Sequence, residues 1–229
     1  MEKHTTHTKA ISRFLQLLDG SFPSGTFVHS FGLEPHIILE KVTHGDELKV
    51  FLENLLIDQY IGFDFVFVKK VYRYFEEDKL NLVVKEDKNF SAMMSYEYSK
   101  ASSDLGENYL KQINFNIQKK TVKSYFEGVK SGKYKGNELC VLSGYAYELG
   151  MDVDTYLLFW AKKNIINIAM ASLKISRIKP SEIQSVLFEF DEVLEKYIES
   201  SEENINSFNP LFEEIIYQHE HLQPKMFVT

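Results

Sequence analysis

Hydrophobic residues recur at three- and four-residue spacing along most of this chain. The run that follows Asp46 contains Leu48, Phe51, Leu52, Leu55 and Leu56, and this spacing predicts an amphipathic helix. Thr43 with Asp46 resembles a capping box at its start. A second run, from Phe63 to Phe75, predicts another helix that ends at the charged residues 76–79.

The same pattern predicts a helix from Ser91 to Asn116. Ala101, Ser102 and Gly106 lie within it, and their small side chains would allow a neighbouring helix to approach closely. Residues 128–136 are basic and punctuated by glycine, which is typical of a connector between helices.

Start and stop signals mark the helices of the second half. Asn137 is a suitable cap for a helix that ends at Gly150, and Asp152 or Asp154 opens a long pattern to about Ser176. Pro180 fits the first turn of the clearest helix. A polar loop over 200–209 and a last short helix from Pro210 complete the chain.

No stretch alternates polar and apolar residues for long enough to predict a strand. We therefore expect an all-α fold, a single-domain helical bundle of about eight to ten helices. The domain would span residues 1–229, with flexible N-terminal residues 1–10 and a C-terminal tail at 219–229.

One segment does not follow the helical pattern. Residues 22–34 read Phe-Pro-Ser-Gly-Thr-Phe-Val-His-Ser-Phe-Gly-Leu-Glu. Pro23 fixes φ, while Gly25 and Gly32 permit left-handed backbone or the close approach of another chain. The segment is therefore either a tightly packed loop that buries its three phenylalanines or a shaped surface for a partner.

Composition excludes several classes of protein. Lys and Arg total 26 against 33 Asp and Glu, a net charge of −7, so nucleic acid is not an expected partner. The single cysteine, Cys140, lies in an apolar helical pattern and is expected in the core. The polar N-terminus and the interrupted apolar stretches predict neither export nor a membrane span, so we expect a cytoplasmic protein.

Candidate chemistry is sparse. The pairs His4/His7 and His219/His221 lack neighbouring ligands at metal-binding spacing, so no metal site and no cofactor are expected. Residues 128–133 are too short for a phosphate loop. Lys162 and Lys163 lie beside aromatic residues and are either a protein-binding face or lysines that extend over the core.

The segment Phe22–Glu34 resembles the N-terminal signature of the urease accessory protein UreF family. Further resemblances follow in the same order along the chain. They are Ser102 and Gly106, Gly144 and Gly150, the stretch Lys174–Gln184, and the terminal His219-Glu220 with Lys225-Met226-Phe227. Departures occur at Arg177–Pro180 and at Pro224-Lys225.

The resemblance implies a non-catalytic all-α homodimer that takes part in urease maturation. Such a protein would link the nickel-handling GTPase UreG to UreD (UreH) and the urease apoprotein, for GTP-dependent nickel insertion. The two termini would bind the partner UreD, and a dimer surface would receive the GTPase. The implied partner-binding residues are Pro23, Gly25, Phe27, His29, Ser30, Gly32, Glu34, His219, Glu220, Lys225 and Phe227.

An alternative interpretation is an all-α enzyme. In that case His29 and Glu34 would act as base and acid in the N-terminal glycine-rich segment. No nucleophile-elbow pattern surrounds Ser24 or Ser30. We therefore expect no catalytic residues.

Overall fold

The computed structural model of the chain describes residues 8–19, 32–201 and 226, which contain ten α-helices, one π-helical segment and no strand. The all-α prediction is confirmed. The elements are α1 (Thr8–Leu18), α2 (Leu33–Ile38), α3 (Gly45–Asn54), η2 (Leu55–Asp64), α4 (Phe65–Glu76), α5 (Leu80–Met93), α6 (Tyr96–Gln112), α7 (Lys120–Lys130), α8 (Glu138–Leu149), α9 (Val153–Ile175) and α10 (Pro180–Ser200).

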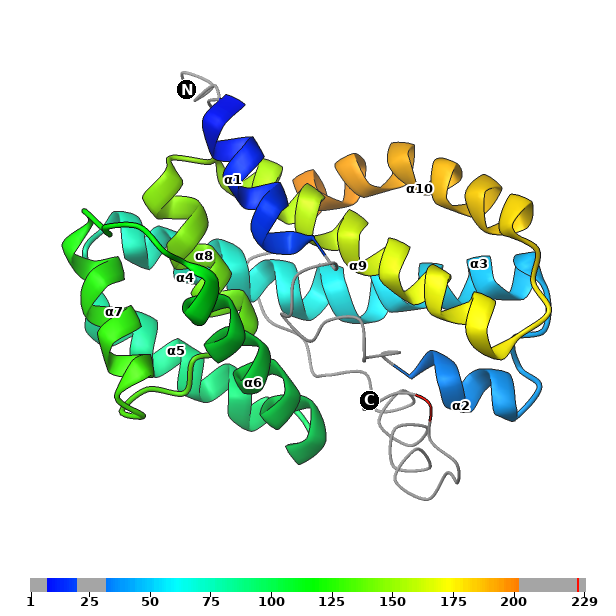
Figure 1. Cartoon of the computed structure of the whole chain (residues 1–229), viewed down its shortest axis with the longest axis horizontal. Helices are drawn as coiled ribbons and strands as arrows, with labels where there is room; N and C mark the ends of the chain where they lie inside the picture. The colour runs from blue at the N-terminus through cyan, green and yellow to red at the C-terminus, as the bar shows by residue number, and fades with distance from the viewer. Residues whose placement is uncertain (1–7, 20–31, 202–225, 227–229) are drawn as a thin grey trace.

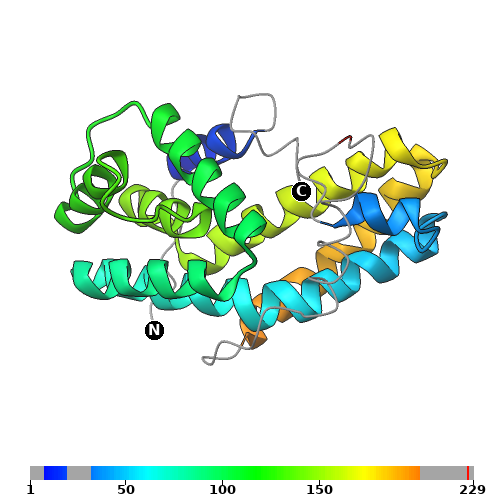
Figure 2. The same ribbon diagram turned by 90° about the horizontal axis from the view of Figure 1, so that it is seen from below.

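Two long helical elements organise the bundle. The first is a continuous rod made of α3, η2 and α4, which runs the length of the molecule in Figure 2. The second is α9, which contacts α1, α2, α4, α8 and α10. In Figure 1, α10 lies along one side of α9. Helices α5 to α8 gather at the end of the molecule opposite α2 and α3. None of the helices in the described ranges is long and apolar enough to cross a membrane.

Four of the predicted helix ends are confirmed. The side chain of Asn137 accepts a hydrogen bond from Leu139 N at 3.0 Å, and α8 ends at Gly150, whose φ is 69°. Asp152 accepts a hydrogen bond from Thr155 N at 2.9 Å at the start of α9. Pro180 opens α10, whose helical pattern extends to Ser200. Short polar side chains and glycine fix these ends, because they satisfy or release backbone groups locally.

The capping box at Thr43 was predicted with the wrong partner. Glu47, rather than Asp46, reaches back to Thr43, and its carboxylate accepts hydrogen bonds from both the backbone N–H and the hydroxyl of Thr43 at 2.7 Å. The N-cap residue is His44, one position later than expected. The first turn of α3 is therefore held by a glutamate side chain rather than by the predicted aspartate.

The predicted helix from Ser91 to Asn116 is two helices. Met94 is extended, and Ser95 caps α6 by accepting a hydrogen bond from Tyr98 N at 3.4 Å. The apolar pattern crosses this break because both helices bury residues in one core, so periodicity alone does not reveal it. The first of these two helices, α5, begins at Leu80, directly after the charged residues 76–79.

The predicted connector at 128–136 begins too early, since α7 continues to Lys130. Gly128 lies within this helix, and Tyr134 packs against it: a Cβ added there would lie 2.1 Å from the ring. Gly106 shows the predicted close approach, since an added Cβ would lie 2.0 Å from the carbonyl oxygen of Gly136. Both glycines permit contacts that any larger residue would block.

The described residues test three further predictions to different extents. Cys140 is fully buried in the core, as expected. Helix α1 begins at Thr8, inside the N-terminal segment for which flexibility was predicted, and Ala10 is buried. The short helix predicted from Pro210 and the tail from His219 lie outside the described residues, apart from Met226.

A buried aspartate on α5 links α5 and α7 to the turn before α8. Asp87 on α5 is fully buried, and its carboxylate accepts hydrogen bonds from the Tyr125 hydroxyl at 2.8 Å, Gly136 N at 2.9 Å and Asn137 N at 3.0 Å. Two backbone donors of the turn before α8 are thereby satisfied away from water. Asp87 thus positions the helix that carries Glu138 into the centre of the molecule.

Candidate functional site

The described part of the predicted partner-binding segment begins at Gly32. Its φ of 85° lies in the left-handed region, which confirms the conformational role expected of this glycine. Helix α2 follows at once, and the ring of His36 makes a 2.7 Å hydrogen bond to the carbonyl oxygen of Gly32. Burial lowers the pKa of His36, so the neutral imidazole is favoured here.

Glu34 connects the N-terminal segment to the C-terminal tail. Its side chain is 1% exposed, and its carboxylate accepts a hydrogen bond from the backbone N–H of Met226 at 2.7 Å. The two residues are 192 positions apart in the chain. The structure thus joins one residue from each of the two regions for which partner binding was predicted.

The other nine predicted partner-binding residues lie outside the described ranges. These are Pro23, Gly25, Phe27, His29, Ser30, His219, Glu220, Lys225 and Phe227. Of the alternative acid and base pair, the described residues contain Glu34 alone. The packing of the three phenylalanines at 22, 27 and 31 likewise stays a prediction.

A second polar region, which sequence reasoning missed, lies in the centre of the bundle. The segment η2 contributes Gln59 and Asp64, which are 8% and 7% exposed. The amide nitrogen of Gln59 lies 3.4 Å from both carboxylate oxygens of Asp64. These residues are five apart, a spacing that the wide turn of a π-helix brings onto one side. The π-helical segment therefore creates this pair.

Glu138 and Lys163 form the other half of this central polar cluster. Glu138 is 5% exposed, and the Tyr109 hydroxyl lies 3.5 Å from its carboxylate. The same hydroxyl accepts a hydrogen bond from the ammonium of Lys163 at 3.4 Å. Tyr109 thus bridges an acid on α8 and a base on α9, and both contacts are near the upper limit for hydrogen bonds.

The acids of the central polar cluster hold their protons more tightly than acids in water. Burial raises the pKa of Asp64 well above its ordinary value, and the charge of Glu138 raises it further, while the Gln59 contact opposes the shift. Burial also raises the pKa of Glu138, against the attraction of Lys163. The Trp160 indole N–H faces Glu138 and helps to lower its pKa, although its geometry falls short of a hydrogen bond.

Lys163 responds in the opposite sense because burial disfavours its charged form. Desolvation lowers its pKa to about 8, although the carboxylate of Glu138 opposes the shift. Asn164, 1% exposed on the same helix, leaves its side-chain oxygen without a hydrogen bond. Helix α9 therefore buries a polar acceptor whose hydrogen bond is not made.

Lys162 does not share this environment. Its ammonium donates to the carbonyl oxygen of Leu187 at 2.7 Å and also pairs with Asp191, so it ties α9 to α10. The two adjacent lysines therefore have separate roles: Lys162 reaches over the core to the next helix, and Lys163 points into the cluster. Among the described residues, no group of three histidine, cysteine or acidic side chains could hold a metal ion.

Comparison with known proteins finds a family match within the helical body of the chain. The family described as UreF matches residues 42–191, which are more than half of the chain and exclude both termini. The chain belongs to the UreF family. This assignment is independent of the signature at residues 22–34, which lies before the matched region.

Relatives of the UreF family extend the similarity over nearly the whole length. The urease accessory protein UreF of Bacillus sp. (strain TB-90) is 23% identical over 219 residues, 93% of this chain and 96% of the relative. The protein of the same description from Ureaplasma urealyticum serovar 10 is 24% identical over 189 residues, 80% of each chain. The chain is therefore an accessory protein of urease maturation by family.

Positions of the UreF resemblance have structural roles here. The hydroxyl of Ser102 accepts a hydrogen bond from Glu138 N at 3.1 Å, and Gly106 receives the turn before α8. A Cβ added at Gly144 would lie 3.1 Å from Phe126 and 3.2 Å from Phe75. These small residues allow α6, α7 and α4 to approach α8 closely.

Proposed function

We propose that this chain is a non-catalytic adaptor that links UreD (UreH), the GTPase UreG and the urease apoprotein for GTP-dependent nickel insertion. Family membership supports a role in urease maturation. The hydrogen bond between Glu34 and Met226 is the observation that favours an adaptor whose two termini form one partner-binding surface. The adaptor needs no cofactor of its own and acts in the cytoplasm.

The proposed surface is formed by the tail that begins at His219, and Glu34, which is 1% exposed, would anchor this tail rather than touch the partner itself. Binding a partner through a terminal segment costs conformational entropy, and an intrachain contact that holds the segment lowers this cost. The contact from Glu34 to Met226 would hold the tail beside α2 in this way. The other predicted residues of the signature would complete the same surface.

We further propose that the adaptor is a homodimer. Ile166 and Met170 are 37% and 38% exposed on consecutive turns of α9. Adjacent apolar side chains on one helical face suit a contact with a second copy, since burying them removes apolar surface from water. The dimer would present two copies of the Glu34 surface.

Two variants, alone and together, test the proposal. One chain ends at Gln218 and lacks the tail, and the other carries Glu34→Ala. We expect each to weaken co-elution with purified UreD about tenfold or more, while helix content by circular dichroism stays the same. In the double variant, Glu34→Ala should have little further effect, because its tail partner is absent.

Glu127→Ala, an exposed change on α7, supplies the matched control and should leave co-elution unchanged. Undiminished co-elution of the shortened chain would show that the tail is dispensable for UreD. If Glu34→Ala weakens co-elution of the shortened chain as much as that of the full chain, the two termini do not act as one surface.

A further inference from the structure

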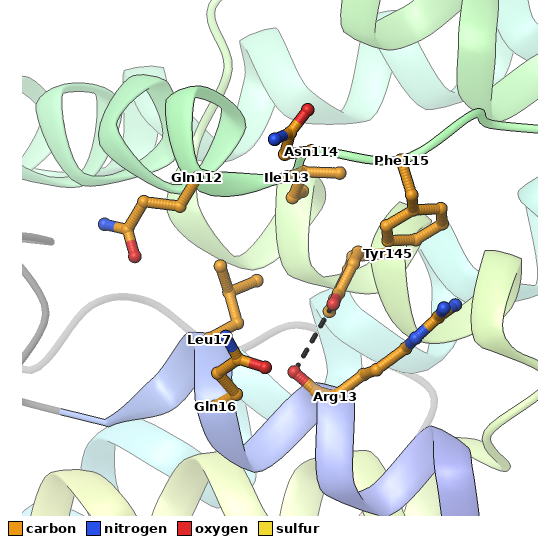
Figure 3. Close-up of a pocket in the computed structure, with 8 residues that line it drawn as sticks. All are labelled: Arg13, Gln16, Leu17, Gln112, Ile113, Asn114, Phe115 and Tyr145. Atoms are coloured by element: carbon orange, nitrogen blue, oxygen red, sulfur yellow. Dashed lines mark hydrogen bonds between the residues drawn. The ribbon is translucent and has the colours of Figure 1, made fainter.

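Two cavities border the segment that joins α6 to α7. The first has a volume of about 350 Å³ and lies between α1 and this segment, as Figure 3 shows. The second, of about 610 Å³, lies between the same segment and the end of α7. Both are lined by Ile113 and Asn114, and we call these two neighbouring cavities together the α6–α7 groove.

The charges along the α6–α7 groove are mainly positive. Its lining includes the cations Arg13, Lys111 and Lys130 and the single anion Glu107. The whole protein has a net charge of −7, so this basic lining contrasts with the rest of the chain. A groove with this charge attracts an acidic ligand.

The cations of the α6–α7 groove are available for new ion pairs. Arg13 packs its guanidinium over the ring of Phe115 at 4.9 Å, and the structure gives it no carboxylate partner among the described residues. Among the described residues, Lys111 donates only to the amide oxygen of Asn108 at 3.2 Å, and Lys111 and Lys130 are both exposed. A guanidinium that packs over an aromatic ring keeps N–H groups that can bind a carboxylate.

The backbone of the segment, which bends at Phe115, leaves hydrogen-bonding groups unpaired. Ile113, which ends α6, has φ −73° and ψ 93°. Within the described part of the chain, the backbone N–H and C=O groups of Asn114 and Phe115 have no hydrogen-bond partner. Unpaired backbone groups of this kind can donate to or accept from the backbone of a bound segment.

The first cavity adds a place for an apolar side chain. Leu17 and Tyr145 are buried at its base, and the Tyr145 hydroxyl donates to the carbonyl oxygen of Arg13 at 3.3 Å. The amide nitrogen of Gln112 is buried there without a hydrogen-bond acceptor. Figure 3 shows Gln16 and Leu17 on the α1 side of the cavity and Gln112 opposite them, at the end of α6.

We propose that the α6–α7 groove binds an extended, acidic segment of a partner protein. The segment would pair its backbone with Asn114 and Phe115, place carboxylates against Arg13, Lys111 and Lys130, and insert an apolar side chain beside Leu17. This inference goes beyond the proposed function, since it assigns a second contact surface away from Glu34. An alternation of acidic and apolar residues fits the groove, because side chains of an extended chain alternate between two sides.

The test uses a peptide probe, so that it does not depend on the urease partners. The probe is fluorescein-Gly-Asp-Leu-Asp-Val-Asp-Leu-amide, and its binding to the full chain is followed by fluorescence anisotropy. We expect saturable binding that weakens at least tenfold in Arg13→Glu and in the double variant Lys111→Glu with Lys130→Glu. The probe with asparagine in place of aspartate should bind at least tenfold more weakly than the acidic probe.

Lys41→Glu is the matched control, because it makes the same charge change at an exposed position between α2 and α3. It should retain binding within about twofold. The lysine double variant alters only exposed residues and keeps the test valid if Arg13→Glu does not fold. Absence of saturable binding, equal weakening by Lys41→Glu, or equal competition by a uridine oligonucleotide would overturn the proposal.

Discussion

Asp87 and Glu138 are both acids buried in the same helical body, but their surroundings differ. Asp87 accepts three hydrogen bonds of 2.8 to 3.0 Å, two of them from backbone N–H groups. The contact from the Tyr109 hydroxyl to the Glu138 carboxylate is longer, at 3.5 Å. Burial raises the pKa of both acids. One acid is therefore built into the fold, and the other is held loosely.

The difference between these acids separates a structural site from a responsive one. A carboxylate that accepts three short hydrogen bonds cannot lose them without leaving buried donors unsatisfied. The central polar cluster around Glu138 contains a second acid, Asp64, and a base, Lys163, whose shifted pKa values make charge states sensitive to pH. We expect substitution of Asp87 to lower the stability of the fold. We expect the contribution of the central polar cluster to stability to change with pH.

Removal of the Asp87 carboxylate should have the largest effect on stability. Asp87→Ala leaves the N–H groups of Gly136 and Asn137 buried without an acceptor. We expect the free energy of unfolding to fall by about 3 kcal/mol or more. Urea unfolding followed by circular dichroism measures the loss.

Asp104→Ala is the matched control for Asp87→Ala. Asp104 forms a 2.7 Å ion pair with Lys100 on the exposed face of α6, with both side chains 59% exposed. Its loss should cost less than about 0.5 kcal/mol. Losses of similar size in the two variants would contradict the structural role assigned to Asp87.

Local signals in the sequence were sufficient to predict much of the fold. Asn137, Gly150 and Pro180 each act within one turn, so their effects could be predicted without knowledge of the tertiary structure. The break at Met94 was not predictable in this way, because apolar residues on both sides face one core. Gly128 was misread as a loop signal because its tertiary partner, Tyr134, was unknown.

The central polar cluster could not be predicted for a related reason. Asp64 interrupts an apolar stretch, and this was the one signal available in the sequence. Its pairing with Gln59 depends on the π-helical turn, which no residue pattern specified. Glu34 was predicted through the UreF resemblance, but its contact with Met226 depends on tertiary structure.

Lys163→Met should remove a pH-dependent part of stability. Folding lowers the pKa of Lys163 from 10.5 to about 8, so the folded state favours the neutral amine. The stability that this preference gives is present above pH 10.5 and is lost as pH falls through 8. Between pH 8 and 10 the native protein should gain on the order of 2 kcal/mol relative to the variant. Parallel unfolding curves for both proteins over this range would contradict the prediction.

The smallest expected effect comes from Asp64→Asn, which keeps the shape and an oxygen acceptor for Gln59. Folding raises the pKa of Asp64 above 3.8, so the folded state favours the protonated acid. This contribution is full below pH 3.8 and is lost as pH rises through the folded pKa. The native protein should therefore gain stability relative to Asp64→Asn as pH falls from 7 to 4. Asp58→Asn, an exposed change on the same π-helical segment, should instead follow the native curve. A native protein that loses stability relative to Asp64→Asn on acidification would show that the buried carboxylate is stabilised in its charged form, as a tightly bound structural acid would be.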